Sequence, residues 1–246
     1  MLPVRRILFA LVLFIAANSE AASVSVLFVG NSLTEKNDLP NTFKQLAAAS
    51  SLHANVEVHS VTPGGAFLYD HWKRGDVVAE LRKLRPNFLV LQGQSTEPVS
   101  AAQSFAHSAA LLKAEADRVG AVTILFSTWA RPAGDPYYKD PSFGGSPAQM
   151  QVRLDSAYAQ VSHSIGATLA PVGVAFEHSQ HDAPQIQLLD GTQHPSPAGT
   201  YLATAVLFRV IFNASPIGST YCDGLPNDMA TRLQRVAETV PLSATR

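Results

Sequence analysis

Short apolar runs that alternate with helical segments limit the fold of this chain more than any other feature. Five runs rich in Val, Ile, Leu and Phe recur at Val24–Val29, Asn55–Val61, Phe88–Gln92, Val122–Ser127 and Thr168–Val172. Segments with helical periodicity lie between them, at Pro40–Ser51, Phe67–Leu84, Ala101–Val119 and Pro147–Ile165. This alternation predicts an α/β fold, a three-layer α/β/α sandwich whose parallel sheet carries helices on both faces. Strands that are apolar along their whole length suit a sheet buried on both sides.

Two segments interrupt the alternation. Residues 130–146 are rich in Gly, Pro and aromatic residues, and we expect this loop to form a wall of a substrate pocket. After Phe212 an irregular connection leads into an amphipathic stretch that ends near Val240 and predicts a packing helix. There are no internal repeats or low-complexity stretches. We therefore expect residues 22–246 to form a single domain.

The first 21 residues have the features of a cleavable signal peptide. Arg5 and Arg6 precede the apolar run Ile7–Ala17, and small residues follow at Ser19 and Ala21. The apolar run is shorter than the roughly 18–20 residues that span a bilayer. No cysteine lies near the expected cleavage point to carry a lipid. We expect a secreted or periplasmic protein without a stable membrane anchor.

Charge and cysteine content exclude several classes of function. The chain has 18 basic and 19 acidic residues and a formal net charge of −1, and this near-neutral balance gives no electrostatic sign of binding to nucleic acid or a membrane surface. Cys222 is the only cysteine, which excludes an intrachain disulfide and a thiolate metal cluster. We expect no metal and no cofactor, and the sequence leaves the oligomeric state open.

The segment Gly30-Asn31-Ser32-Leu33-Thr34 directly follows the first expected strand. Ligands of α/β folds bind at the carboxyl ends of the parallel strands, so Ser32 is a candidate nucleophile. The backbone N–H of Ser32 is also a candidate donor to an oxyanion. The structural alternative for Ser32 is a hydroxyl that caps a turn or a helix.

Two further candidates follow the second and third expected strands. Gly64 can offer an unobstructed N–H to an oxyanion, and Gln94 can offer its side-chain amide. The alternatives are an ordinary turn at Pro63-Gly64-Gly65 and a polar side chain that satisfies backbone groups at Gln94.

Asp190 and His194 form the strongest local signal. Ser196 and Pro197 predict that a helix begins just after His194, which would hold the imidazole at a rigid junction. A carboxylate four positions upstream can accept from Nδ1–H, set the tautomer and leave Nε2 to take a proton from serine. The alternative is a surface turn at Asp190-Gly191.

In this order, the segments resemble those of the SGNH/GDSL hydrolases, a family of esterases and lipases. The resemblance covers Gly30–Thr34, Gly64 and the Asp190 to Pro195 segment. It implies a flavodoxin-like fold, a Ser32, His194 and Asp190 triad, and an oxyanion hole built from Ser32, Gly64 and an amide. The chain has Gln94 where the family has Asn, and Asn31 where its name-giving motif has Asp.

The family separates its Asp and His by three positions, whereas Asp190 and His194 are four apart. Two other ways to orient His194 therefore remain open. One is His181-Asp182, which lies upstream, and the other is a Ser–His dyad whose imidazole is oriented by a backbone carbonyl.

These observations predict an exported serine esterase that hydrolyses carboxylic esters, with acetyl esters of carbohydrates as one substrate class. Asn31, Trp129 and Tyr137 are candidate substrate-binding residues. Other aromatic and imidazole side chains either line the same cleft or belong to the core, namely Tyr69, His71, Trp72 and Tyr138. The alternative function is a non-catalytic carbohydrate- or envelope-binding domain of the same fold. A phosphate-binding flavodoxin-like protein is disfavoured because no Gly-x-Gly-x-x-Gly pattern accompanies residues 30–34.

Overall fold

A five-stranded parallel sheet forms the middle layer of the computed structural model, which describes residues 23–242. The strands are β1 (Val24–Val29), β2 (Val56–Val61), β3 (Phe88–Gln92), β4 (Val122–Phe126) and β5 (Thr168–Ala170). Their order is β2-β1-β3-β4-β5, which is the flavodoxin-like order. The predicted fold class is confirmed. The predicted signal peptide, residues 1–21, lies outside the described residues.

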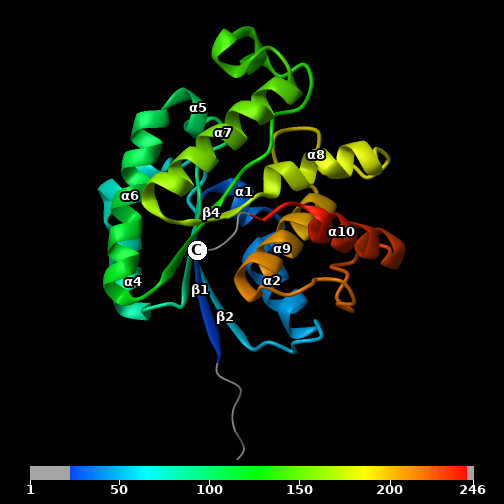
Figure 1. The fold of residues 1–246 in the computed structure, drawn as a ribbon, viewed down its shortest axis with the longest axis horizontal. Coiled ribbons are helices and arrows are strands. Elements are labelled where there is room, and N and C mark those ends of the chain that lie inside the picture. The colour runs from blue at the N-terminus through cyan, green and yellow to red at the C-terminus, as the bar shows by residue number, and fades with distance from the viewer. Residues whose placement is uncertain (1–22, 243–246) are drawn as a thin grey trace, which may run out of the picture.

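Helices cover both faces of the sheet (Figure 1). One layer contains α2 (Leu39–Ala48), α8 (Val172–Asp182), α9 (Pro197–Phe212) and α10 (Asn227–Thr239). The other contains α3 (Leu68–Arg74), α4 (Asp76–Leu84), α6 (Ala102–Val119) and α7 (Pro147–Ile165). Alternate residues of β1 pack toward opposite layers: Val26 and Phe28 belong to the first apolar core, and Leu27 and Val29 to the second.

Short helical turns lie in the loops that follow the carboxyl ends of β1, β3 and β4. They are α1 (Ser32–Glu35), η1 (Lys36–Asp38), α5 (Glu97–Ser100), η2 (Pro136–Lys139) and η3 (Pro141–Phe143). The second strand, β2, lies on one side of β1, and the third, β3, lies on its other side, so the strand order reverses between β1 and β3. Helix α1 follows β1 at this switch point. Crevices at switch points are the usual ligand sites of open α/β sheets.

Helix α9 is apolar on nearly all sides because it packs against α2, α8 and α10 as well as the sheet. Its start matches the prediction, since the Ser196 hydroxyl accepts from the Gly199 N–H at 3.2 Å and Pro197 is the first helical residue. Most residues of α9 are buried, so the helix gives the His194 loop a firmly packed end.

Among the longer helices, the structure differs from the expected elements in two places. Gly75 has a φ of +72°, so the predicted helical region 67–84 is divided into α3 and α4. Helix α8 was not expected, because Val172 extends the apolar run of β5 and Gly173 disfavours a helix in sequence terms. Gly173 is needed there, since any Cβ would overlap the Thr128 carbonyl and the Gln151 side chain.

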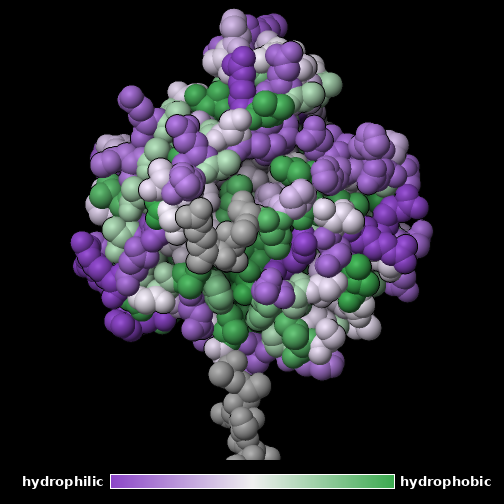
Figure 2. Space-filling model, in the orientation of Figure 1, coloured by the Kyte–Doolittle hydropathy of each residue, from purple (hydrophilic) through white to green (hydrophobic). Residues whose placement is uncertain are grey.

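The loop between β4 and α7 projects from the body of the protein at the top of Figure 1. Figure 2 shows that its outer surface is largely hydrophilic. Asp135 and Asp140 cap its two 3-10 turns with their carboxylates. Within residues 23–242, no helix combines the length and apolar character needed to cross a membrane.

Candidate active site

Ser32 is the first residue of α1 and lies at the carboxyl end of β1. Asn31 caps this helix, because its side-chain oxygen accepts from the Leu33 N–H at 3.0 Å. Asn31 and Leu33 are buried, whereas Ser32 is partly exposed. The first N–H groups of a helix find no partner within it, so the Ser32 N–H is placed to serve a ligand.

His194 lies on the loop between α8 and α9 and contacts Ser32. Its Nε2 atom lies 3.0 Å from Ser32 Oγ, although 162 residues of chain separate the two. This distance is within the range for a general base that accepts the hydroxyl proton. The structure therefore brings together the predicted nucleophile and the predicted base.

The Asp190 carboxylate reaches the imidazole through Thr192. The Thr192 hydroxyl donates to Asp190 Oδ1 at 2.6 Å and lies 3.0 Å from His194 Nδ1. Hydrogen bonds from the Thr192 hydroxyl and N–H, together with Lys36 at 3.5 Å, hold the pKa of Asp190 below its ordinary value. Thr192 is one of the three residues that separate Asp190 from His194. Thr192 was not among the predicted partners of His194, which were carboxylates and a backbone carbonyl.

Asp182, the alternative to Asp190 as partner of His194, contacts a different histidine. It lies at the exposed end of α8, where its carboxylate pairs with the neighbouring His181 at 2.8 Å. The backbone of the His194 loop is closed by the Asp190 N–H, which donates to the His194 carbonyl at 3.1 Å.

The Gln94 amide is oriented by Thr96. Its oxygen accepts from the Thr96 N–H at 2.7 Å and the Thr96 hydroxyl at 2.9 Å, which leaves the NH₂ group to donate. Gly64 lies in an exposed turn between β2 and α3. That turn is tied to the nucleophile loop, because Asn31 Nδ2 donates to the Ala66 carbonyl at 3.0 Å. Asn31 therefore ties the nucleophile loop to this turn, and a substrate-binding role for it stays a prediction.

Gln92 is a buried residue of the site that sequence analysis missed. Its side-chain oxygen accepts from the Asn31 N–H at 3.0 Å and from the Thr34 hydroxyl at 2.9 Å, and its nitrogen donates to the Gly93 carbonyl. A Cβ at position 30 would overlap the same oxygen, which explains Gly30. In the sequence, the only sign of this role is a polar residue at the end of an otherwise apolar strand.

His71 and Glu97 are buried and form hydrogen bonds with backbone groups of the loops that carry the site residues. His71 was a candidate for the aromatic cleft, but it is fully buried and its Nε2–H donates to the Gly30 carbonyl at 2.8 Å. Burial lowers the pKa of His71. Glu97 accepts from the N–H groups of Leu68 at 3.0 Å and Gln94 at 2.9 Å, so it joins the loops after β2 and β3. Burial raises its pKa to about 7.

Trp129 and Tyr137 occupy different environments. Trp129 is almost completely buried and stacks on Phe176 at 4.1 Å, and its indole N–H donates to the Gln193 carbonyl at 3.0 Å. It therefore holds the residue next to His194. Tyr137 is exposed on the projecting loop, where the Arg131 guanidinium lies 4.1 Å above its ring. A substrate-binding role for Trp129 and Tyr137 stays a prediction.

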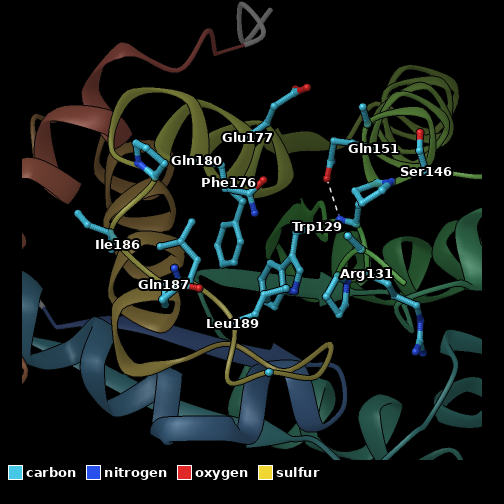
Figure 3. Close-up of a pocket in the computed structure, with 18 residues that line it drawn as sticks. Trp129, Arg131, Ser146, Gln151, Phe176, Glu177, Gln180, Ile186, Gln187 and Leu189 are labelled. Carbon is cyan, nitrogen blue, oxygen red and sulfur yellow. Dashed lines mark hydrogen bonds between the residues drawn. The ribbon is translucent and has the colours of Figure 1, made fainter. Parts of the chain in front are cut away.

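A pocket of about 620 Å³ borders the His194 loop (Figure 3). Its walls come from residues 129–133, the start of α7, the middle of α8 and residues 184–191. Trp129 and Leu189 contribute apolar surface, and Gln151, Glu177 and Gln180 contribute polar groups. Gln151 is fixed because its oxygen accepts from the Ala130 N–H at 2.8 Å. Within residues 23–242, no group of three or more His, Cys, Asp or Glu side chains is arranged to hold a metal ion.

Comparison with known proteins is informative at the level of structure. Protein-family models and curated sequences gave no match. Among solved structures, a protein from Slackia heliotrinireducens that is assigned to the SGNH hydrolases is 32% identical, with a TM-score of 0.63 over 77% of this chain and 100% of that chain.

Two more distant structures share the fold. A DUF4886 family protein from Bacteroides uniformis has a TM-score of 0.74 at 16% identity, over 88% of this chain and 93% of that chain. A variant of an acetyl xylan esterase from Geobacillus stearothermophilus has a TM-score of 0.56 at 14% identity, over 77% of this chain and 93% of that chain. The identity and coverage of the Slackia protein show that this chain belongs to the SGNH/GDSL hydrolase family.

Proposed function

We propose that this chain is an exported serine esterase that hydrolyses carboxylic esters. The single observation that carries the proposal is the 3.0 Å contact between Ser32 Oγ and His194 Nε2 at the switch point of the sheet. Membership of a hydrolase family supports it.

In the proposed reaction, His194 takes the proton of Ser32 as the hydroxyl attacks the ester carbonyl. The tetrahedral oxyanion accepts hydrogen bonds from the Ser32 N–H, the Gly64 N–H and the Gln94 amide. His194 then protonates the leaving alcohol, which departs as the acyl-enzyme forms. Water, activated by the same imidazole, releases the acid and restores Ser32.

The experiment is labelling with a fluorophosphonate probe, together with hydrolysis of p-nitrophenyl acetate. Wild-type protein should be labelled, Ser32→Ala should not, and the exposed Ser51→Ala is the matched control. Loss of the nucleophile should reduce kcat by a factor on the order of 10⁴ or more. Wild-type protein that is folded, unlabelled and inactive would instead indicate the non-catalytic binding domain.

The proposed substrate class is acetyl esters of carbohydrates, the class that the name of the Geobacillus protein gives for that protein. Hydrolysis rates for acetylated sugars, p-nitrophenyl esters of increasing chain length and lysophospholipids test this choice. A preference for long acyl chains would overturn it.

The proposed export depends on residues 1–21. Expression of the full chain in a bacterial host, followed by fractionation and intact mass measurement, should give a periplasmic or external protein that begins at residue 22. A cytoplasmic protein that retains Arg5 and Arg6 would contradict export.

A further inference from the structure

We propose that Thr192 is a positioning residue, whose hydroxyl links the Asp190 carboxylate to the His194 imidazole. The proposal rests on the proposed function, since it concerns the base of the same site. It replaces a direct contact between carboxylate and imidazole with a chain of three groups, Asp190, Thr192 and His194.

The hydrogen-bond capacity of the hydroxyl determines the direction of each bond. A threonine hydroxyl has one proton to donate and two lone pairs that accept. The Asp190 carboxylate can only accept, so the Thr192 proton points to Asp190 Oδ1 at 2.6 Å. The two lone pairs then face His194, whose backbone N–H lies at 3.2 Å and whose Nδ1 lies at 3.0 Å.

This assignment specifies the tautomer of His194. Since Thr192 Oγ1 accepts, Nδ1 of His194 carries the imidazole proton, and Nε2 presents its lone pair to Ser32 Oγ. When Nε2 takes the serine proton, the positive ring donates from Nδ1 to a hydroxyl whose own proton points at a carboxylate. No proton has to move beyond Nδ1, and the Asp190 charge stabilises the imidazolium through one intervening group.

The local backbone holds Thr192 in place for this task. Gly191 has a φ of +93°, which turns the chain so that Asp190 Oδ1 also accepts from the Thr192 N–H at 3.0 Å. The branched side chain of threonine restricts rotation about χ1, so the hydroxyl keeps its direction. Lys36 lies 3.5 Å from Asp190 Oδ2 and helps to keep the carboxylate ionised.

The decisive variants are Thr192→Val and Thr192→Ser. Valine has the shape of threonine without the hydroxyl, whereas serine keeps the hydroxyl without the methyl group. With p-nitrophenyl acetate, we expect kcat of Thr192→Val to fall about 10- to 100-fold and KM to change little, because the interaction acts on the charged imidazole. Thr192→Ser should keep kcat within about threefold of wild type.

Two further readouts separate positioning from structural damage. The acidic limb of the kcat/KM–pH profile should move to lower pH in Thr192→Val and in Asp190→Asn, because the imidazolium loses its stabilising partner. The double variant should be no worse than Thr192→Val alone, since the two residues act as one chain. Wild-type kcat in Thr192→Val, equal losses in the Val and Ser variants, or additive losses in the double variant would overturn the proposal.

A measurement on the resting protein distinguishes failure of this proposal from failure of the esterase assignment. Imidazole ¹⁵N chemical shifts above pH 8 should show His194 with its proton on Nδ1 in wild type and Thr192→Ser, and a shift toward the Nε2–H form in Thr192→Val. A wild-type ring protonated on Nε2 would overturn the link, whatever the activity. If the tautomers behave as expected but Ser32 is not labelled, only the esterase assignment fails.

Discussion

Ser32 and His194 lie within hydrogen-bond distance of each other, but the chain holds them in different ways. The Ser32 side is fixed by buried side chains: Gln92 and His71 are fully buried, and Asn31 is nearly so. The His194 side is a surface loop, in which Asp190, Gly191 and Thr192 are exposed. Its anchors are the Trp129 N–H and Asn37, which donates to the Pro195 carbonyl at 3.0 Å.

The two halves of the site therefore depend on different interactions for their stability. Buried polar groups that lose a partner cost free energy of folding, whereas exposed groups can turn to water. We therefore expect changes on the Ser32 side to lower stability. Changes on the His194 side should lower kcat while leaving most of the stability intact.

Gln92→Leu should give the largest effect. It removes the acceptor of the Asn31 N–H and the Thr34 hydroxyl, so two buried donors lose their partner. We expect the free energy of unfolding to fall by about 4 kcal/mol, measured by urea denaturation. Gln103→Leu on the exposed face of α6 is the control. Equal stability of the two variants would show that the buried network does not hold the nucleophile loop.

Glu97→Gln should change how stability depends on pH. The folded pKa of Glu97 is about 7 against an ordinary value of 4.5, so its contribution to stability is full below about pH 4.5 and is lost as pH rises toward 7. Wild type should therefore lose about 2 kcal/mol more between pH 5 and pH 8 than Glu97→Gln does. Urea unfolding at both pH values measures this difference, with the exposed Glu57→Gln as control. Parallel pH dependence in wild type and Glu97→Gln would contradict the prediction.

Trp129→Phe should give the smallest loss of stability and test the His194 side. Phenylalanine keeps the stack on Phe176 but cannot donate to the Gln193 carbonyl. We expect unfolding free energy to fall by about 1 kcal/mol and kcat by about 3- to 10-fold. Trp72→Phe, in the opposite helix layer, is the control. A stability loss as large as that of Gln92→Leu would remove the contrast between the two sides.

Much of the fold was predictable because strands and helices follow local periodicity. The five apolar runs became β1 to β5, and Ser196 and Pro197 marked the start of α9. Helix α8 was missed because it contains Gly173. A glycine is required there because any Cβ would overlap the Thr128 carbonyl, which is distant in sequence. A local pattern contains no information about such a contact.

The residues of the candidate site also divide into those that local sequence could identify and those whose roles depend on tertiary contacts. Ser32, Gln94 and His194 could be named because each follows a strand or precedes a helix, at the edge where parallel strands place ligands. The roles of Gln92, His71 and Glu97 could not be predicted, because they depend on which backbone groups these side chains bond. Thr192 was missed for the same reason, although it lies between two residues that were named.

From the sequence alone, the five strands, the helices between them and their parallel arrangement could be predicted, and hence the edge of the sheet at which Ser32 and His194 lie. Periodicity and helix caps are local properties, so they can be read from neighbouring residues alone. The tertiary structure decided the 3.0 Å distance between Ser32 and His194 and the insertion of Thr192 between Asp190 and the imidazole. These depend on how separate loops pack, and a displacement of 1 Å decides whether a hydrogen bond forms.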